Sequence, residues 1–158
     1  MPPSRNDRTA YRSREGRTVP RPGDGGANAK SLPLPASAEA FLTEPHVCTL
    51  TTLRPDGTPH VAPVRFTWDR TTGTARVMTV ASRRKAGNLL AAPGTRVAIC
   101  QVAGPRWITL EGPATVSDDP RRLAEGVRRY ADRYGSPPPT PPGLVVIEIA
   151  VDRVMGLY

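Results

Sequence analysis

A tight turn between two extended segments limits the topology of this chain more than any other feature. Residues 46–53 are rich in β-branched side chains and are followed by Arg54-Pro55-Asp56-Gly57-Thr58. Proline fixes one backbone dihedral of such a turn and glycine supplies the positive one, so residues 59–68 must return antiparallel as a hairpin. Residues 69–73 predict a second tight turn, which leads into a third strand at residues 74–80. Because three hairpin-connected strands precede the first substantial helix, an alternating βαβ chain with a parallel sheet is excluded.

The remainder of the chain continues with strands and inserted helices. Four more segments predict extended structure: residues 96–102, 106–116, 144–151 and 153–158. Three segments predict helices: residues 37–42 capped by Ser37, residues 82–92, and a longer stretch that begins at Asp119-Pro120. We therefore expect a mainly β fold with inserted helices, arranged as an antiparallel β-barrel of about six strands, because a closed barrel leaves no exposed strand edge.

Two irregular positions fall within predicted strands. Pro63 lies in the middle of residues 59–68 and has no N–H group for a central ladder position, which indicates a sheet edge, a bulge or a place where the backbone turns toward a ligand. Gly112-Pro113 is expected to bend the long strand at residues 106–116.

The chain is expected to hold one domain, residues 37–158, preceded by a disordered tail. Residues 1–36 are crowded with Arg, Pro and Gly and have few large aliphatic side chains, so they bury too little surface to offset the entropy of ordering. The tail has no apolar core of a secretory signal, and its acidic residues argue against a transit peptide. No stretch reaches membrane-spanning length, so we expect a soluble, cytoplasmic protein with no membrane partner.

The formal net charge of +8 favours anionic ligands. Much of the excess lies in the tail, and aromatic residues make up only 5% of the chain, so stacking platforms for nucleic acid are scarce and no nucleic-acid partner is expected. Cys48 and Cys100 lack the CxxC spacing of a metal or redox pair, and we expect both to be buried free thiols.

The helix predicted at residues 82–92 begins with an unfavourable charge. Ser82 is a good N-cap, but Arg83, Arg84 and Lys85 follow it, where the positive end of the helix dipole prefers acidic side chains. Free N–H groups, the dipole and three cationic side chains together predict a site for an anion such as phosphate. The alternative is a solvated surface turn whose arginines bind nothing.

No acid–base machinery is evident elsewhere. His46 and His60 have no carboxylate or cysteine at a useful spacing, and His60 is expected to be an ordinary strand residue at the mouth of the barrel. Motifs for metals, nucleotides or a serine nucleophile are missing. If the protein is an enzyme, a cofactor must therefore carry the reaction.

Several motifs resemble one known family. The two strands around the Arg-Pro-Asp-Gly-Thr turn, the second reaching Pro63-Val64, resemble the opening of pyridoxamine 5′-phosphate oxidase-like split β-barrel proteins. Arg83-Arg84-Lys85 followed by Asn88-Leu89 resembles the RxKxxNL signature of the branch that uses the deazaflavin coenzyme F420. Arg106-Trp107 ahead of Glu111-Gly112, and the segment Arg153 to Gly156, are similar to that branch too. The resemblance covers residues 41–158.

The resemblance implies a homodimeric split β-barrel in which the cationic turn holds the cofactor phosphate and a second subunit completes the pocket. By motif match, Arg83 and Lys85 would contact the phosphate, and Asn88 would support the turn. The strand end at Thr79-Val80 would contact the ring system. The implied cofactor-binding set is Pro63, Val64, Thr79, Val80, Ser82, Arg83, Arg84, Lys85 and Asn88.

The implied reaction is hydride transfer between F420 and a small conjugated substrate such as an enone, a quinone or a tetrapyrrole-like molecule. FMN is the alternative cofactor, and a non-catalytic module that binds a flavin, deazaflavin or haem is the alternative function. Arg65-Phe66 stands where many relatives carry a Trp or Asn before an aromatic, so the resemblance leaves the substrate open.

A dimer is also expected from the apolar strands, because the runs at residues 97–102 and 144–151 need more cover than two short helices give. Trp107 is expected either to form a wall of the pocket or to lie in the core or the dimer interface.

Overall fold

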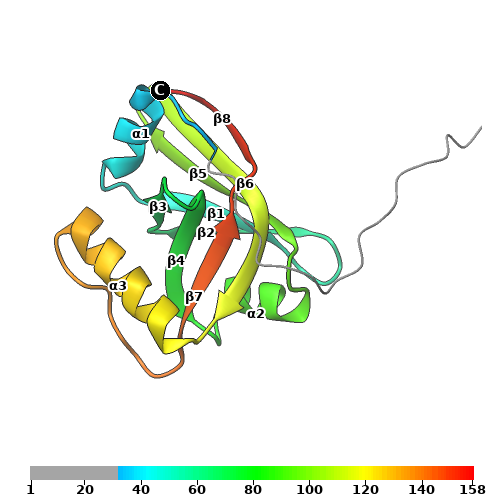
Figure 1. Cartoon of the computed structure of the whole chain (residues 1–158). Coiled ribbons are helices and arrows are strands. Elements are labelled where there is room, and N and C mark those ends of the chain that lie inside the picture. The colour runs from blue at the N-terminus through cyan, green and yellow to red at the C-terminus, as the bar shows by residue number, and fades with distance from the viewer. Residues whose placement is uncertain (1–31) are drawn as a thin grey trace, which may run out of the picture.

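The computed structural model describes residues 32–158 (Figure 1). In this part of the chain the elements, in order, are α1 (Ala36–Thr43), β1 (Cys48–Leu53), β2 (Pro59–Val64), β3 (Thr67–Asp69), β4 (Thr74–Val80), α2 (Arg84–Ala91), β5 (Arg96–Ala103), β6 (Arg106–Ser117), α3 (Pro120–Tyr134), β7 (Leu144–Ala150) and β8 (Arg153–Leu157). The tail predicted at residues 1–36 falls for the most part outside the described residues. Leu34 packs against the core, just ahead of α1.

All strand pairs among the described residues are antiparallel, and they form one sheet in the order β2-β1-β5-β6-β7-β4-β3, with β8 paired to β6. The predicted mainly β fold with inserted helices is therefore confirmed. The strand number was too low, since the described residues form eight strands rather than about six. The expected closure is also absent there, because no hydrogen-bonded pairing joins β2 to β3 and these two strands end the sheet.

Pro63 occupies an edge strand, which is one of the three situations that the sequence indicated. β2 pairs only with β1 among the described strands, so the missing N–H of Pro63 interrupts no central ladder. The segment predicted as one strand, residues 59–68, is divided at Arg65-Phe66 into β2 and β3. This break lets the chain leave one half of the sheet and join the other.

β6 links the two halves of the sheet and bends at Gly112, which confirms the predicted irregularity. Residues 107–111 of β6 pair with β8, whereas residues 114–117 pair with β7. The chain between β7 and β8 crosses closely over the bend, so that a Cβ on Gly112 would overlap the carbonyl oxygen of Ala150. Only glycine allows this approach of two backbones.

The core lies between the curved sheet and the helices. Its largest fully buried side chains include Phe41, Phe66, Leu50, Ile99, Ile108, Leu110 and Ile147. α3 lies against β4 and β7, where Gly126 contacts Met78 and Val146 (Figure 1). Along the stripe of larger apolar and aromatic side chains on this helix, Tyr130 is buried, and Leu123, Val127 and Tyr134 are half-buried.

The predicted caps of α1 and α3 had different outcomes. Asp119 caps α3 as expected, since its carboxylate accepts from the N–H groups of Arg121 and Arg122, each at 3.0 Å. Ser37 does not cap α1: the helix begins one residue earlier, at Ala36, and its N-cap position holds Pro35 with no side-chain bond. Ser37 thus lies inside the first turn, where its hydroxyl is not placed to accept from the free N–H groups.

Both cysteines are free thiols, as predicted. Cys48 is buried, and burial raises the pKa of its thiol to about 11. Cys100 is only half-buried, because it projects from the outer face of the sheet.

Replacing Gly112 with Ala should destabilise the fold, because the new Cβ overlaps backbone atoms that cannot rotate away. We expect a loss of about 1–3 kcal/mol or more in the free energy of unfolding, measured by urea denaturation. Gly87→Ala is the matched control: it lies within α2 and a Cβ there meets nothing within 4 Å. That variant should be more stable by about 0.5–1 kcal/mol. Equal effects of the two changes would contradict the close crossing at Gly112.

Candidate functional site

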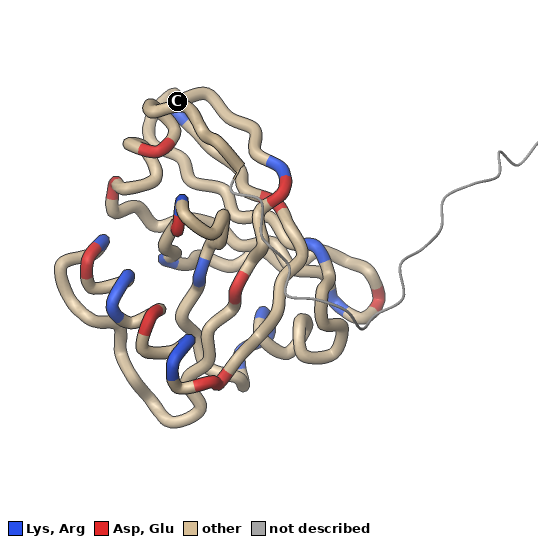
Figure 2. The backbone as a smooth tube through the Cα atoms, in the orientation of Figure 1, with Lys and Arg blue, Asp and Glu red and all other residues tan. Residues whose placement is uncertain are grey.

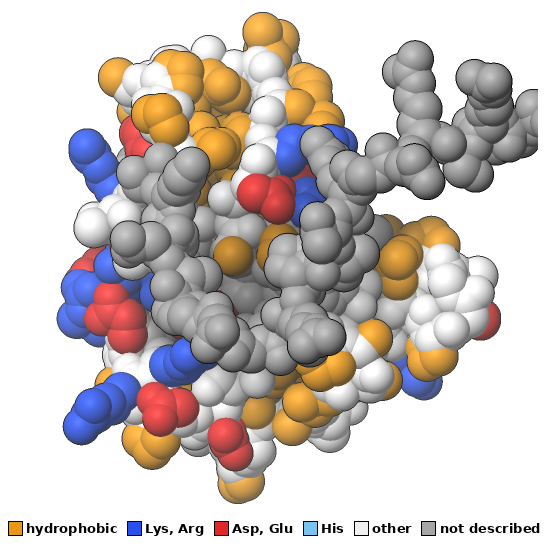
Figure 3. Space-filling view, turned by 45° about the vertical axis from the view of Figure 1, so that its right-hand side comes forward, with side chains coloured by type: hydrophobic (Ala, Val, Ile, Leu, Met, Phe, Trp, Pro, Cys, Tyr) orange, Lys and Arg blue, Asp and Glu red, His pale blue; other side chains and the backbone are white. Residues whose placement is uncertain are grey.

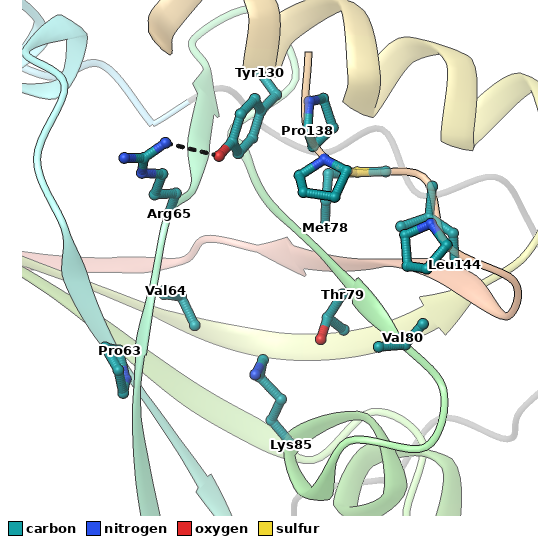
Figure 4. Close-up of a pocket in the computed structure, with 12 residues that line it drawn as sticks. Pro63, Val64, Arg65, Met78, Thr79, Val80, Lys85, Tyr130, Pro138 and Leu144 are labelled. Atoms are coloured by element: carbon teal, nitrogen blue, oxygen red, sulfur yellow. Dashed lines mark hydrogen bonds between the residues drawn. The ribbon is translucent and has the colours of Figure 1, made fainter. Parts of the chain in front are cut away.

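A cleft of about 280 Å³ lies between the C-terminal end of β2 and the C-terminal end of β4. It is lined by Pro63, Val64, Arg65, Met78, Thr79, Val80, Lys85, Tyr130, Pro138, Pro139, Pro141 and Leu144. Figure 4 shows Lys85 rising from α2 on one side of the cleft and Arg65 with Tyr130 on the other. The cleft brings together five of the nine residues predicted to bind a cofactor, namely Pro63, Val64, Thr79, Val80 and Lys85.

Lys85 points from the start of α2 into the cleft, toward Val64 and Thr79 (Figure 4). Partial burial lowers the pKa of its ammonium group, and the nearby Arg83 lowers it further. Both effects disfavour the charged form, and the opposite charge of an anion bound beside Lys85 would offset them.

The start of α2 differs from the predicted one. The helix begins at Arg84, and Arg83 occupies the N-cap position without a side-chain cap. Ser82 was therefore wrong as the cap: it lies one residue before the N-cap and is exposed. With neither a capping hydroxyl nor an acidic residue in the first turn, the N-terminal N–H groups of α2 have no side chain of their own to satisfy them.

The cationic turn, Arg83 to Lys85, has no ion-pair partner within residues 32–158. Several arginines elsewhere in the described chain are paired: blue and red positions alternate along α3 in Figure 2, and Arg128 pairs there with Glu125 and Asp132. The turn is therefore a concentration of positive charge that the described part of the chain leaves uncompensated.

Asn88 fixes α2 to the sheet. It is buried, and its amide donates to the hydroxyl of Thr52 in β1 at 2.9 Å. Asn88 does not line the cleft, and neither do Ser82, Arg83 and Arg84. Its position matches a supporting role, because Asn88 lies one helical turn after Arg84 and Lys85 and holds that turn against β1.

The opposite wall of the cleft contains residues that sequence reasoning did not assign to a site. Arg65 donates to the hydroxyl of Tyr130 at 3.1 Å, and its guanidinium lies 5.1 Å from the ring centre of Tyr134. This hydrogen bond raises the pKa of Arg65 further, so the side chain remains a cation. The signals available in the sequence were the unusual Arg65-Phe66 pair and the aromatic stripe of the helix, but nothing in the sequence placed them together.

Other functional features are not found in the described residues. Within residues 32–158 no group of three or more His, Cys, Asp or Glu side chains is placed to hold a metal ion. In the same part of the chain, no helix has the length and apolar character needed to cross a membrane. Trp107 is not among the cleft-lining residues; it is 37% exposed on the outer face of the sheet.

A model of the pyridoxamine 5′-phosphate oxidase family matches residues 34–158, which is nearly all of the described chain. The chain belongs to this family. The resemblance seen in the sequence is thereby confirmed, and with it the split-barrel fold.

Two individual proteins are also similar to this chain. An F420H(2)-dependent biliverdin reductase from Mycobacterium tuberculosis (strain CDC 1551 / Oshkosh) is 45% identical over 119 residues, which cover 75% of this chain and 85% of that protein. A solved structure of an F420 reductase is 28% identical, with a TM-score of 0.62, and the match covers 77% of this chain and 98% of the other.

A conserved hypothetical protein from Mycobacterium tuberculosis shares the fold as well. Its crystal structure is 22% identical, with a TM-score of 0.65, and the match covers 80% of this chain and 86% of that one.

Asn88→Ala should destabilise the protein, because it removes the donor from Thr52 and leaves that hydroxyl buried without a partner. We expect a loss of about 1–3 kcal/mol in the free energy of unfolding by urea denaturation. Thr52→Val, which removes the other half of the same bond, is the matched variant. The double variant should lose less than the sum of the two single losses, since both remove one interaction. Strictly additive losses would mean that the bond does not join α2 to β1.

Proposed function

We propose that this protein is an F420-dependent oxidoreductase that transfers a hydride between the deazaflavin and a small conjugated substrate of the tetrapyrrole class. The observation that carries the proposal is the uncompensated cationic turn, whose Lys85 reaches into a cleft formed by the strand ends predicted to contact a cofactor ring. The relative that is 45% identical, an F420H(2)-dependent biliverdin reductase, supports both the cofactor and the substrate class.

The residues at the turn fit the phosphate of such a cofactor. Lys85 is a partly buried ammonium group that has no carboxylate partner in the described chain, and the first N–H groups of α2 lack a capping side chain. A phosphate group accepts hydrogen bonds from both kinds of donor and is favoured by the dipole of the helix. A deazaflavin bound there in its reduced form supplies the hydride.

The chain's own contribution is to bind and orient the reactants. None of the residues that line the cleft has a carboxyl or imidazole group, so the proton that accompanies the hydride is taken from solvent in this proposal. Lys85 would hold the cofactor phosphate, while Val64, Thr79 and Val80 would lie along the ring. Arg65, which Tyr130 holds at the opposite wall, would receive a carboxylate of the substrate.

Titration of the protein with F420 and FMN side by side, followed by turnover of reduced F420 with biliverdin, enones and quinones, tests the proposal. Tight F420 binding with oxidation by biliverdin is the expected result. Preference for FMN would indicate the alternative cofactor. Binding without turnover of any acceptor would indicate a non-catalytic flavin or deazaflavin module.

We also propose that the functional unit is a homodimer. The outer face of the half-sheet β2-β1-β5-β6-β8 carries exposed apolar side chains: Val61 at 60%, Val102 at 57%, Leu157 at 62%, with Trp107 and Met155. The strand register places Trp107 opposite both Val102 and Leu157, so these side chains form one patch. In Figure 3, hydrophobic side chains gather at the upper end of the molecule, where β8 and the C-terminus lie.

A second copy of this chain suits the outer face for a geometric reason. Pro63 lies on the same outer face as Val61, two residues along β2, and it also lines the cleft. A copy packed against the patch would therefore reach the open side of the cleft and complete it, as the family resemblance implies.

Lys85→Ala should weaken F420 binding by roughly 1.5–3 kcal/mol, the scale of a charge-assisted hydrogen bond, which is about one to two decades in Kd. The same change should leave the thermal stability of the cofactor-free protein equal or slightly higher, because it removes a cation from the positive end of a helix. Calorimetric titration and thermal melts measure the two effects.

Arg121→Ala is the matched control for charge, since Arg121 is exposed at the start of α3 and has no ion pair within the described residues. It should leave F420 affinity unchanged. Unchanged affinity in Lys85→Ala, together with a loss of apo stability, would contradict the phosphate assignment and indicate a structural lysine.

Trp107→Glu should convert the dimer to a monomer at micromolar concentration, because it places a charge at the centre of the apolar patch. Sedimentation equilibrium measures the change. Leu90→Glu is the control: Leu90 is 52% exposed but lies on α2, away from the outer face, and its replacement should leave the dimer intact. A monomeric wild-type protein at the same concentration would refute the shared cleft.

A further inference from the structure

His60 lies beside the cationic turn. Along β2 the half-buried His60 and Ala62 and the buried Val64 face the interior, while Val61 and Pro63 face outward. The strand register places His60 opposite Thr52, and residues paired in this way have side chains on the same face of the sheet. Thr52 accepts the hydrogen bond of Asn88. The imidazole therefore lies next to the point where α2 is fixed to β1.

The Nδ1 atom of His60 is buried and has no hydrogen-bond partner within the described residues. A buried polar atom without a partner is unfavourable for the protein alone, because it has lost its hydrogen bonds to water. A ligand group beside the ring would remove this cost.

The charged groups that face His60 are all cations. Arg84 and Lys85 lie one helical turn before Asn88, and Arg54 comes from the turn between β1 and β2, where it donates to the carbonyl of Pro59. Burial lowers the pKa of His60 most, and Arg54, Lys85 and Arg84 lower it further in that order. Thr52, which lies opposite His60, and Asn88, which is bonded to Thr52, are uncharged. In the protein alone these effects all favour the neutral form of the imidazole.

We propose that His60 is part of the anion site at the start of α2, and that its imidazole takes up one proton from solvent when a phosphate group binds beside it and Lys85. In this step a hydronium ion or a buffer acid gives its proton to the ring and is left as water or the conjugate base. The new N–H bond of the imidazolium then donates to a phosphate oxygen. The inference rests on the proposed function only in taking that phosphate to belong to F420.

Phosphate binding reverses the effect of the surrounding charges on the protonation of His60. The bound phosphate neutralises the cations that keep His60 uncharged, and it offers an acceptor to the ring. The pKa of His60 must then rise on binding, so the affinity for phosphate increases as the pH falls through the interval between the two values. Within this interval the gain is at most about tenfold per pH unit, and above it the affinity no longer depends on this group.

The titration of the imidazoles by NMR tests the inference directly, because the chain has only two histidines. The full chain is titrated from about pH 5 to 8.5, alone, with inorganic phosphate and with F420. His46→Gln assigns the remaining signal to His60. His46 is the internal control: it is hydrogen-bonded to Glu44 at 2.8 Å, ahead of β1, and its signal should not respond to phosphate.

The expected result is that phosphate and F420 each move the titration of His60 to higher pH, and that Lys85→Ala abolishes the response to phosphate. Calorimetry in two buffers of different ionisation enthalpy should show uptake of up to one proton per F420 bound. His60→Gln should abolish this uptake and flatten the pH dependence of Kd, while His46→Gln should retain both.

A His60 signal that titrates identically with and without phosphate and F420 would overturn the inference, and this measurement does not require any His60 variant to fold. If F420 binds tightly without moving His60, the inference fails and the proposed function stands. If F420 does not bind but inorganic phosphate moves His60 in a Lys85-dependent manner, the proton-linked anion site stands and the proposed function fails.

Discussion

The close crossing of two backbones at Gly112 determines where a cleft can form in this protein. β6 is paired with β5 over residues 106–113, with β8 over residues 107–111 and with β7 over residues 114–117, so one continuous strand belongs to both halves of the sheet. β2 and β4 are far apart along the hydrogen-bonded path, since β1, β5, β6 and β7 lie between them. The bend folds the sheet over its own core and brings their C-terminal ends to one cleft. If β6 were straight, the cleft residues at the end of β2 would lie far from those at the end of β4.

The cationic turn is tolerated because the rest of α2 is well anchored. Ala86, Asn88 and Leu89 are buried, and Asn88 is hydrogen-bonded to β1. Burying a leucine side chain contributes about 1.5–3 kcal/mol, whereas an exposed charge at a helix end costs about 0.3–1 kcal/mol. Packing therefore outweighs the unfavourable electrostatics. The helix can present three cations at its start without a ligand, and that charge remains available to bind one.

Local chemistry explains which parts of this structure could be predicted from the sequence. The hairpin at Pro55 to Gly57, the cap at Asp119 and the edge position of Pro63 each depend on a few adjacent residues, and all three were predicted. The Ser82 cap failed because capping requires one particular residue position, which depends on where the packing of Ala86 and Leu89 starts the helix. The short β3 and the lack of closure depend on how the chain turns at Arg65, which no local pattern specifies. The contact of Arg65 with Tyr130 joins residues 65 positions apart and arises only in the folded chain.

The two walls of the cleft differ in how the chain forms them. The wall at α2 takes Thr79, Val80 and Lys85 from one continuous segment of the chain, so the phosphate site that we propose there could be predicted from the sequence. The opposite wall is assembled from β2 and α3, and from the prolines that follow α3. Both walls carry a cation without a carboxylate partner in the described chain, Lys85 on one and Arg65 on the other. A single ligand with one phosphate would satisfy only the first, so the charge pattern favours two ligands bound together: a phosphate-bearing cofactor against α2 and a carboxylate-bearing substrate against Arg65.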